Sequence, residues 1–280
     1  MRRIGSELAA DGAVGALGFA LGDTRELVRS NAVWALTRIG SHAAQIAARR
    51  ALADSDFRIR QAACQSAFAT EDHNALEQLM SLLRDEAPAV RREAARALGR
   101  LGLPDAVLRL GDAAAAVEHY AVLTPALVYG LIEIADPDET RKLLEDRRPR
   151  VRRAGLIALD QSSPGSLSAE SVFDALRSPD AVLRSAALAI AAKHSRWGPE
   201  AAAYLEFAFA DAHRAGFSET GARILPAFLP APEVRAWFRK QLSPGSSFSV
   251  NHLRAGLAAL LLVALSMPPR TRPPPRGALA

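Results

Sequence analysis

Apolar residues recur at helical spacing along most of this 280-residue chain. One stripe with a period near 3.6 residues is formed by Val90, Ala94, Ala97, Leu98 and Leu101. A second stripe matches it position for position and consists of Val28, Ala32, Ala35, Leu36 and Ile39. Each stripe is followed by a glycine, Gly102 or Gly40, as is common after a helix C-terminus. The pattern predicts helices that occupy equivalent surroundings.

A short polar turn precedes these helices and recurs along the chain. In each copy a turn residue is followed five positions later by an aliphatic residue, and in the clear copies an Arg comes next. The clear copies begin at Asp23, Asp54, Asp85, Asp146 and Ser178, and a degenerate copy begins at Asp112. The first three begin 31 residues apart and the later ones 27, 34 and 32 apart. This period is typical of stacked helical hairpins.

The rest of the chain fits the same architecture less regularly. Around the third turn we expect a first helix over 74–83 and a second helix over 90–101. Residues 113–135 form an apolar stretch that Thr124-Pro125 interrupts, and residues 160–166 form a polar loop. Further helices are predicted over 199–210, 219–228, 232–242 and 250–265, and strand patterns are absent. We therefore predict an all-α fold, a right-handed α-solenoid of about seven to eight hairpins over residues 1–266. The Pro- and Arg-rich segment 267–280 is expected to be a disordered tail.

The repeated motif D-x-x-x-x-V-R-x-x-A-x-x-A-L-x-x-[LI]-G, as in residues 85–102, resembles the HEAT repeat, in the short bacterial form of phycobilisome-lyase-like and armadillo-type proteins. The resemblance covers residues 5–195 closely and 199–265 loosely. It implies a ladder of hydrogen bonds in which the turn Asp and the Arg six residues later join neighbouring hairpins. By match, the ladder consists of Asp23, Arg29, Asp54, Arg60, Asp85, Arg91, Asp146, Arg152 and Arg184. Glu118 and Ser178 depart from the pattern at the fourth and sixth repeats.

A narrower resemblance concerns residues 127–136 and 151–161. These stretches are similar to the HEAT portion of large secreted bacterial haem-binding proteins, which carry a C-x-x-C-H site in another domain. That motif is absent from this sequence. The resemblance would make this chain a scaffold without the redox centre, or a fragment.

The net charge of +5 first suggests a polyanionic partner. However, Arg2, Arg3, Arg270, Arg272 and Arg276 account for all of it, so residues 4–269 carry no net charge. A protein that neutralises phosphates along a groove would be expected to carry its excess charge in the folded body. The distribution disfavours nucleic acid as the partner.

Several basic residues and one aromatic residue lie off the apolar stripes of the second helices. In HEAT-like arrays these helices line the concave side, so we expect a protein partner, with acidic groups, to bind there. The predicted contact residues are Trp34, Arg38, Arg92, Arg96, Arg100, Arg153 and Lys193. Glu93 and Asp160 are the only acids within these helices. The alternative is a solvated, salt-bridged face, with Trp34 packed against the adjoining repeat.

The sequence offers little for catalysis. Cys64 is the only cysteine, which we expect to be buried, and the six histidines form neither H-E-x-x-H nor the paired His-Glu motifs of HEAT-type iron hydroxylases. Glycine-rich phosphate loops and nucleophile elbows are also absent. We therefore predict a non-catalytic scaffold without a metal or cofactor. The alternatives are a HEAT-type DNA glycosylase and a bilin lyase or chaperone.

The segment 255–265 is apolar on all sides, yet it is shorter than the roughly 20 residues that span a bilayer. A helix of this kind at the end of an array needs a cover, which the preceding pair, a second copy of the chain or a further domain would supply. The N-terminus lacks the apolar core of a secretion signal. A cytoplasmic location is therefore the default expectation.

Overall fold

The computed structural model describes residues 12–116, 123–209 and 215–241. Within these ranges the chain is helical and contains no strand, which confirms the predicted all-α fold. The chain divides into two compact units, Met1–Ser168 and Ala169–Ala280. The prediction of one continuous array over residues 1–266 stays a prediction, and the segments 255–265 and 267–280 lie outside the described residues.

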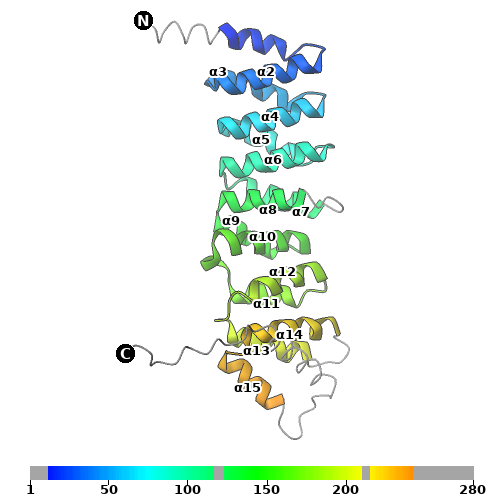
Figure 1. The fold of residues 1–280 in the computed structure, drawn as a ribbon, viewed down its shortest axis with the longest axis vertical. Helices are drawn as coiled ribbons and strands as arrows, with labels where there is room; N and C mark the ends of the chain where they lie inside the picture. Colours follow the sequence, from blue (N-terminus) through cyan, green and yellow to red (C-terminus); the bar gives the residue numbers. More distant parts are fainter. Residues whose placement is uncertain (1–11, 117–122, 210–214, 242–280) are drawn as a thin grey trace, which may run out of the picture. The chain divides into compact units, whose positions relative to one another are not determined.

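Unit 1 consists of five helical hairpins, counted over its described residues (Figure 1). In each hairpin a first helix is followed by a turn and a second helix. The first helices are residues 12–20, α3 (His42–Arg49) with η1 (Arg50–Ala53), η2 (His73–Ala75) with α5 (Leu76–Leu82), α7 (Ala106–Ala116), and α9 (Pro137–Lys142) with η3 (Leu143–Glu145). The second helices are α2 (Glu26–Ile39), α4 (Phe57–Thr70), α6 (Pro88–Leu101), α8 (Leu123–Ile134) and α10 (Pro149–Ser162), after which η4 (Pro164–Ser166) follows.

The ends of the second helices follow from their sequence. Pro88 and Pro149 are the first residues of α6 and α10, where the missing N–H has no acceptor to lose. Gly40 and Gly102 follow α2 and α6 with φ of 64° and 65°, a left-handed conformation that glycine adopts without a steric penalty. Pro125, which seemed to interrupt a helix, lies in the first turn of α8, where backbone amides need no acceptor.

The predicted apolar stripe of α6 lies in the core of unit 1. Val90, Ala94, Ala97 and Leu98 are fully buried and Leu101 nearly so. The matching stripe of α2 is less complete, because Val28, Ala35 and Ile39 remain partly exposed at the first hairpin. The second helices also pack directly on one another, with α6 between α4 and α8, whereas successive first helices share fewer contacts.

The closest approach between second helices joins α6 and α8 through two glycines. A Cβ atom placed on Gly99 would lie 2.8 Å from the Cα atom of Gly130. A Cβ atom placed on Gly130 would lie 2.9 Å from the backbone oxygen of Ala95. Because both obstacles are backbone atoms, the two helices can pack this closely only with glycine at these positions.

The structure corrects the predicted position of the fourth turn. Asp112 lies inside α7 rather than at a turn, so the copy assigned to Asp112–Val117 is wrong. The buried residues of α8 include Leu123, Leu127, Leu131 and Ile134, which have the same spacing as Val90, Ala94, Leu98 and Leu101. The fourth repeat therefore begins six residues later than predicted. The polar loop is also shorter, because α10 continues through Ser162.

Unit 2 contains α11 (Ala169–Leu176), α12 (Ala181–Ala191), α13 (Gly198–Phe209), α14 (Ala215–Phe228) and α15 (Pro232–Gln241). The pairs α11 with α12 and α13 with α14 form two more hairpins. Its core is aromatic, since the ring of Phe173 contacts those of Trp197, Tyr204 and Phe228 at centroid distances of 6.1–6.4 Å. The helices predicted from residue 199 to residue 242 are confirmed with small shifts of their ends, while the segment 250–265 lies outside the described residues. None of the described helices is long and apolar enough to cross a membrane.

Candidate functional site

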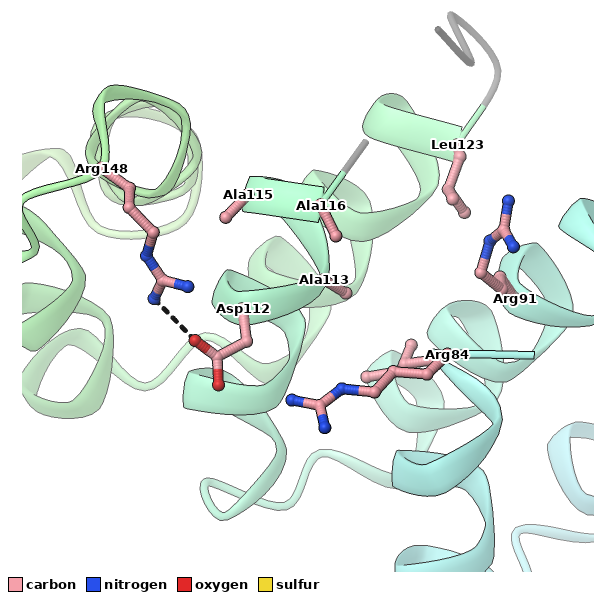
Figure 2. A pocket seen from close by; sticks show the side chains of 9 residues that line it. Arg84, Arg91, Asp112, Ala113, Ala115, Ala116, Leu123 and Arg148 are labelled. Atoms are coloured by element: carbon pink, nitrogen blue, oxygen red, sulfur yellow. Dashed lines mark hydrogen bonds and ion pairs between the residues drawn. The ribbon is translucent and has the colours of Figure 1, made fainter. Parts of the chain in front are cut away.

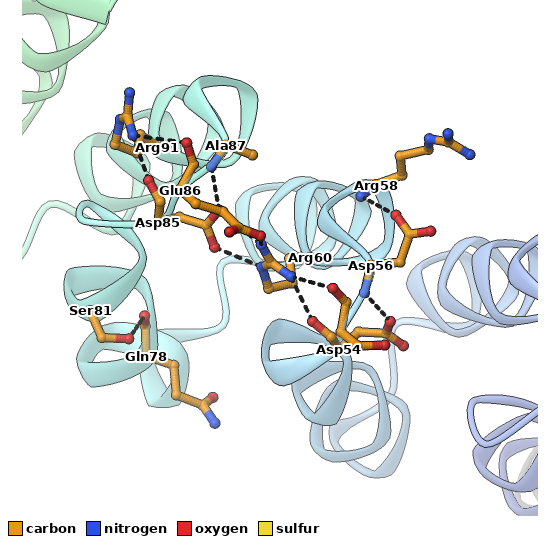
Figure 3. Close-up of polar contacts among 11 residues, drawn as sticks. Asp54, Asp56, Arg58, Arg60, Gln78, Ser81, Asp85, Glu86, Ala87 and Arg91 are labelled. Atoms are coloured by element: carbon orange, nitrogen blue, oxygen red, sulfur yellow. Dashed lines mark hydrogen bonds and ion pairs between the residues drawn. The ribbon is translucent and has the colours of Figure 1, made fainter.

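Arg60 and Asp85 link the second and third hairpins of unit 1 at their turns (Figure 3). The guanidinium group donates from Nε to Asp85 Oδ2 at 2.6 Å and from Nη2 to Oδ1 at 2.9 Å. Its Nη1 donates to the carbonyl oxygens of Asp54 and Ser55 at 2.8 and 2.9 Å. One side chain thus satisfies the turn of its own repeat and pairs with the carboxylate of the next.

Arg29 makes the equivalent contacts one repeat earlier, from Nε to Asp54 Oδ2 at 2.8 Å and from Nη1 to the carbonyl oxygen of Asp23 at 2.9 Å. Arg91 and Arg184 donate to the carbonyl oxygens of their own turns, at Asp85 and Ser178 respectively. Arg152, which was assigned to the same ladder, lies in the first turn of α10 and is partly exposed. Each turn carboxylate also accepts a backbone N–H two residues later, as Asp146 does from Arg148 at 2.7 Å. These contacts stabilise the turns, and the exposed sides of the helices take no part in them.

The turn carboxyl groups are stabilised in their ionised form. Burial alone would raise the pKa of Asp85, but hydrogen bonds from Arg60 and from the backbone N–H of Ala87 lower it below the usual value. The hydrogen bond from the Arg148 side chain lowers the pKa of Asp146. The hydrogen bond from the side chain of Arg25 lowers the pKa of Asp23. The carboxyl groups of Asp23, Asp85 and Asp146 are therefore ionised at neutral pH.

The exposed side of the second helices in unit 1 is the candidate site, and we call it the second-helix face. We count positions from the aliphatic residue near the start of each second helix, namely Val28, Ile59, Val90, Leu123 and Val151. At about 100° per residue, the positions two, six and ten residues later lie on one side of the helix. All of these positions are exposed or partly exposed. The middle column consists of Trp34, Gln65, Arg96, Tyr129 and Ile157. The flanking columns are Ser30, Gln61, Arg92, Pro125 and Arg153 on one side, and Arg38, Ala69, Arg100, Glu133 and Gln161 on the other.

Arg96 lies at the centre of this face. Its Nη1 donates to Glu93 Oε2 at 2.8 Å, and its guanidinium carbon lies 5.1 Å from the centroid of the Phe68 ring. Glu93 is 3% exposed, and its Oε1 accepts from Nε and Nη2 of Arg92 at 3.2 and 3.0 Å. One buried carboxylate therefore neutralises part of the charge of two arginines. The face is less positive than its arginine content suggests.

Tyr129 and Trp34 are the exposed aromatic residues of the middle column. Tyr129 is 52% exposed and hydrogen-bonds to Glu133, which raises the pKa of its hydroxyl. Glu133 Oε2 is buried and accepts no hydrogen bond from the described residues. Trp34, on α2, is 45% exposed, so half of its surface packs within the fold and the other half is available to a partner.

The other predicted contact residues lie in different settings. Arg38 and Arg100 lie in the last turns of α2 and α6, where a positive charge is favoured by the helix dipole. Arg100 pairs with Glu71 at 2.5 Å, and Arg153 is partly exposed on α10. Lys193 was expected on a second helix beside the others. It follows the C-terminus of α12 and belongs to unit 2.

A separate cavity of about 560 Å³ lies near the break in the repeat pattern (Figure 2). It is lined by Leu83, Arg84, Arg91, Asp112, Ala113, Ala115, Ala116, Leu123 and Arg148. Arg148 donates from Nη2 to Asp112 Oδ1 at 2.6 Å across it. Residues 117–122, which connect two lining residues, lie outside the described ranges. For this reason we assign no ligand to the cavity.

The described residues provide little for catalysis. They contain no cluster of three or more His, Cys, Asp or Glu side chains that could hold a metal ion. Cys64 is fully buried, and this burial raises the pKa of its thiol to about 12. His194 stacks on Trp197 with 4.2 Å between ring centroids. His119, His213 and His252 lie outside the described residues.

Tyr129 belongs to the face and Phe68 borders it, although the sequence did not single them out. Phe68 falls within the regular second repeat, at a position where the first and third repeats carry Thr37 and Gly99. Tyr129 was hidden by the misplaced fourth turn. The spacing of Leu123, Leu127 and Leu131 would have revealed it, because Tyr129 follows Leu123 by the same six positions that separate Arg96 from Val90.

The repeats of unit 1 match a known family. The family model described as HEAT repeats matches residues 2–69 and 48–127. The helical hairpins of unit 1 are the stacked repeats of an α-solenoid, and over the matched residues they are similar to HEAT repeats. The predicted resemblance to the HEAT repeat is confirmed there. No curated protein matches the chain.

Several solved structures are similar to the chain at low identity. The complex of CpcE and CpcF of phycocyanin lyase from Nostoc sp. PCC7120 is 19% identical, with a TM-score of 0.43, and the match covers 88% of this chain and 94% of that one. Human deoxyhypusine hydroxylase in complex with glycerol is 18% identical, with a TM-score of 0.38, and the match covers 93% of this chain and 99% of that one. We derive no activity from either similarity.

Proposed function

We propose that this chain is a non-catalytic scaffold that binds a protein partner on the second-helix face of unit 1. The observation that supports it best is the placement of Trp34, Arg96 and Tyr129 in one column, each at least partly exposed. Trp, Arg and Tyr are the residue types most enriched among the energetically dominant contacts of protein interfaces.

The anchoring residues are held in place before any partner arrives. Arg96 lies on the ring of Phe68 and is hydrogen-bonded to Glu93, and Tyr129 is hydrogen-bonded to Glu133. Side chains that are already ordered lose less conformational entropy on binding. This favours a recognition role over a face that is merely solvated.

The charge arrangement disfavours nucleic acid. Glu93 partly neutralises Arg92 and Arg96, and Glu71 pairs with Arg100. A phosphate-binding groove needs uncompensated cations, because each phosphate contact requires one. A protein partner with few charges in contact fits this face better, and so the glycosylase alternative has less support.

Site-specific photo-crosslinking tests this proposal. A photoreactive phenylalanine analogue would replace Trp34 or Tyr129 in the whole chain. The same replacement of Ile46, on the first helix α3, is the matched control because Ile46 is also half exposed. We expect protease-sensitive, nuclease-resistant adducts from the first two positions only. Adducts that form equally at position 46, or that nuclease removes, would contradict the proposal.

A further inference from the structure

The second-helix face has a spacing that selects one kind of partner segment. Packed helices lie about 8–10 Å apart, and an extended chain advances about 3.3 Å per residue. A strand that crosses the second helices therefore moves by about three residues from one repeat to the next. Trp34 and Arg96 lie two repeats apart, so the partner residues that contact them would be about six positions apart in the partner sequence. Arg96 and Tyr129 lie in adjacent repeats, so their partner residues would be about three positions apart.

Arg96 has hydrogen-bond donors to spare. A guanidinium group carries five N–H donors, and among the described residues Arg96 uses only one of its nitrogens, Nη1, toward Glu93. No described residue accepts a hydrogen bond from its Nε or Nη2, and the side chain is 45% exposed. Two adjacent nitrogens of this kind match the two oxygens of a carboxylate. An incoming carboxylate can bind without displacing Glu93.

The flanks of Arg96 favour an acidic segment as well. Arg38 and Arg153, at the two ends of the face, form no ion pair with any described residue. The acids on or beside the face are Glu71, Glu93, Glu133 and Asp160, and the arginines of the face outnumber them by five to four. The face therefore carries a small net positive charge, to which Arg38 and Arg153 contribute at its two ends.

We propose, building on the function above, that the partner segment is an extended acidic peptide. Its Asp or Glu binds Arg96, a large apolar residue three positions away contacts Tyr129, and another about six positions away on the other side contacts Trp34. The half-exposed rings supply apolar contact area, and Arg96 fixes the register because the two oxygens of a peptide carboxylate match its Nε and Nη2.

Selection of random 12-residue peptides displayed on phage tests this inference. The whole chain is the target, and an excess of soluble Trp34→Ser chain removes peptides that bind elsewhere. The expected result is enrichment of an acidic residue with a large apolar residue three positions away. Enriched peptides that need Trp34 but lack this spacing would overturn the inference and leave the proposed function standing. Peptides that bind the Trp34→Ser chain equally well would overturn both.

Fluorescence anisotropy with a selected peptide then tests the role of Arg96. Arg96→Lys keeps the charge but loses the paired nitrogens, so affinity should fall about tenfold or more. Arg84→Lys is the matched control, since Arg84 is exposed and lies outside the second-helix face, and it should leave affinity unchanged. Equal affinities of the Arg96→Lys and unmodified chains would contradict the assignment of the carboxylate to Arg96, provided that both show the same thermal unfolding.

Discussion

Arg60 and Asp85, which are 25 residues apart, are joined by two hydrogen bonds between adjacent repeats, and both side chains are largely buried. Removing one partner of such a pair leaves the other charge without compensation in a poorly solvated place. We therefore expect the pair to stabilise the packing of the second repeat against the third.

Asp85→Ala should lower the free energy of unfolding by about 2–4 kcal/mol, because it leaves the Arg60 guanidinium only a 3.4 Å ion pair with the exposed Glu86 and leaves the N–H of Ala87 without its acceptor. Chemical denaturation measures this. Asp105→Ala is the control, since Asp105 is exposed and pairs with no described residue, and its effect should stay within about 0.5 kcal/mol. Equal effects of the two substitutions would show that the pair contributes nothing specific.

Gly99→Ala should destabilise unit 1 by about 1–3 kcal/mol, because its methyl group would meet the backbone of Gly130 at 2.8 Å and force α6 and α8 apart. The difference in unfolding temperature between the Gly99→Ala chain and the unmodified chain measures this loss of stability. Gly165→Ala provides the same substitution in open space, where nothing lies within 4 Å, and we expect no loss of stability. If Gly99→Ala were as stable as Gly165→Ala, the close contact between the helices would be disproved.

The stabilising effect of Asp85 should depend on pH. Its pKa is lower in the folded chain than in the unfolded chain, so its contribution is fully present above the unfolded pKa of about 3.9 and is lost as the pH falls through the folded pKa. The difference in unfolding temperature between the unmodified chain and Asp85→Asn should therefore be constant from pH 7 to about 5 and narrow below about 4. A difference that widens toward low pH would have the wrong sign.

Cys64 should be inert in the folded chain, because burial raises the pKa of its thiol to about 12 and leaves almost no thiolate at pH 8. Mass spectrometry after iodoacetamide treatment should show no adduct until denaturant is added. Ala69→Cys, on the exposed side of the same helix, should give one adduct under native conditions. Rapid native labelling of Cys64 itself would mean that α4 is not packed as described.

Much of the fold could be predicted because each regular repeat carries its own signals. The turn Asp, the aliphatic residue and the following Arg fix the start of the second helix, and Gly40 and Gly102 mark where α2 and α6 end. The fourth repeat was misplaced because Asp112 imitates a turn residue while lying inside α7. The burial of Leu123 and Leu127 shows the true register, which their spacing in the sequence also indicates.

The candidate face was harder to predict, because pairing depends on contacts between repeats. Arg92 and Arg96 looked like uncompensated charges, yet Glu93 lies three positions after Val90, close enough to the core to be buried between them. The ion pair between Arg100 and Glu71 joins two repeats, so the sequence around either residue does not indicate it. Sequence reasoning located the arginines of unit 1 but overestimated the net positive charge of the face.

The most direct test of the account is the affinity of a partner segment for chains altered on opposite sides of unit 1. Anisotropy titrations with one peptide selected on the unmodified chain without the Trp34→Ser competitor would compare the unmodified chain with Trp34→Ser on α2 and Ile46→Ser on α3, two residues of similar exposure. The account predicts that Trp34→Ser lowers affinity at least about tenfold and Ile46→Ser leaves it unchanged. Retained affinity in Trp34→Ser, with loss in Ile46→Ser, would contradict the account.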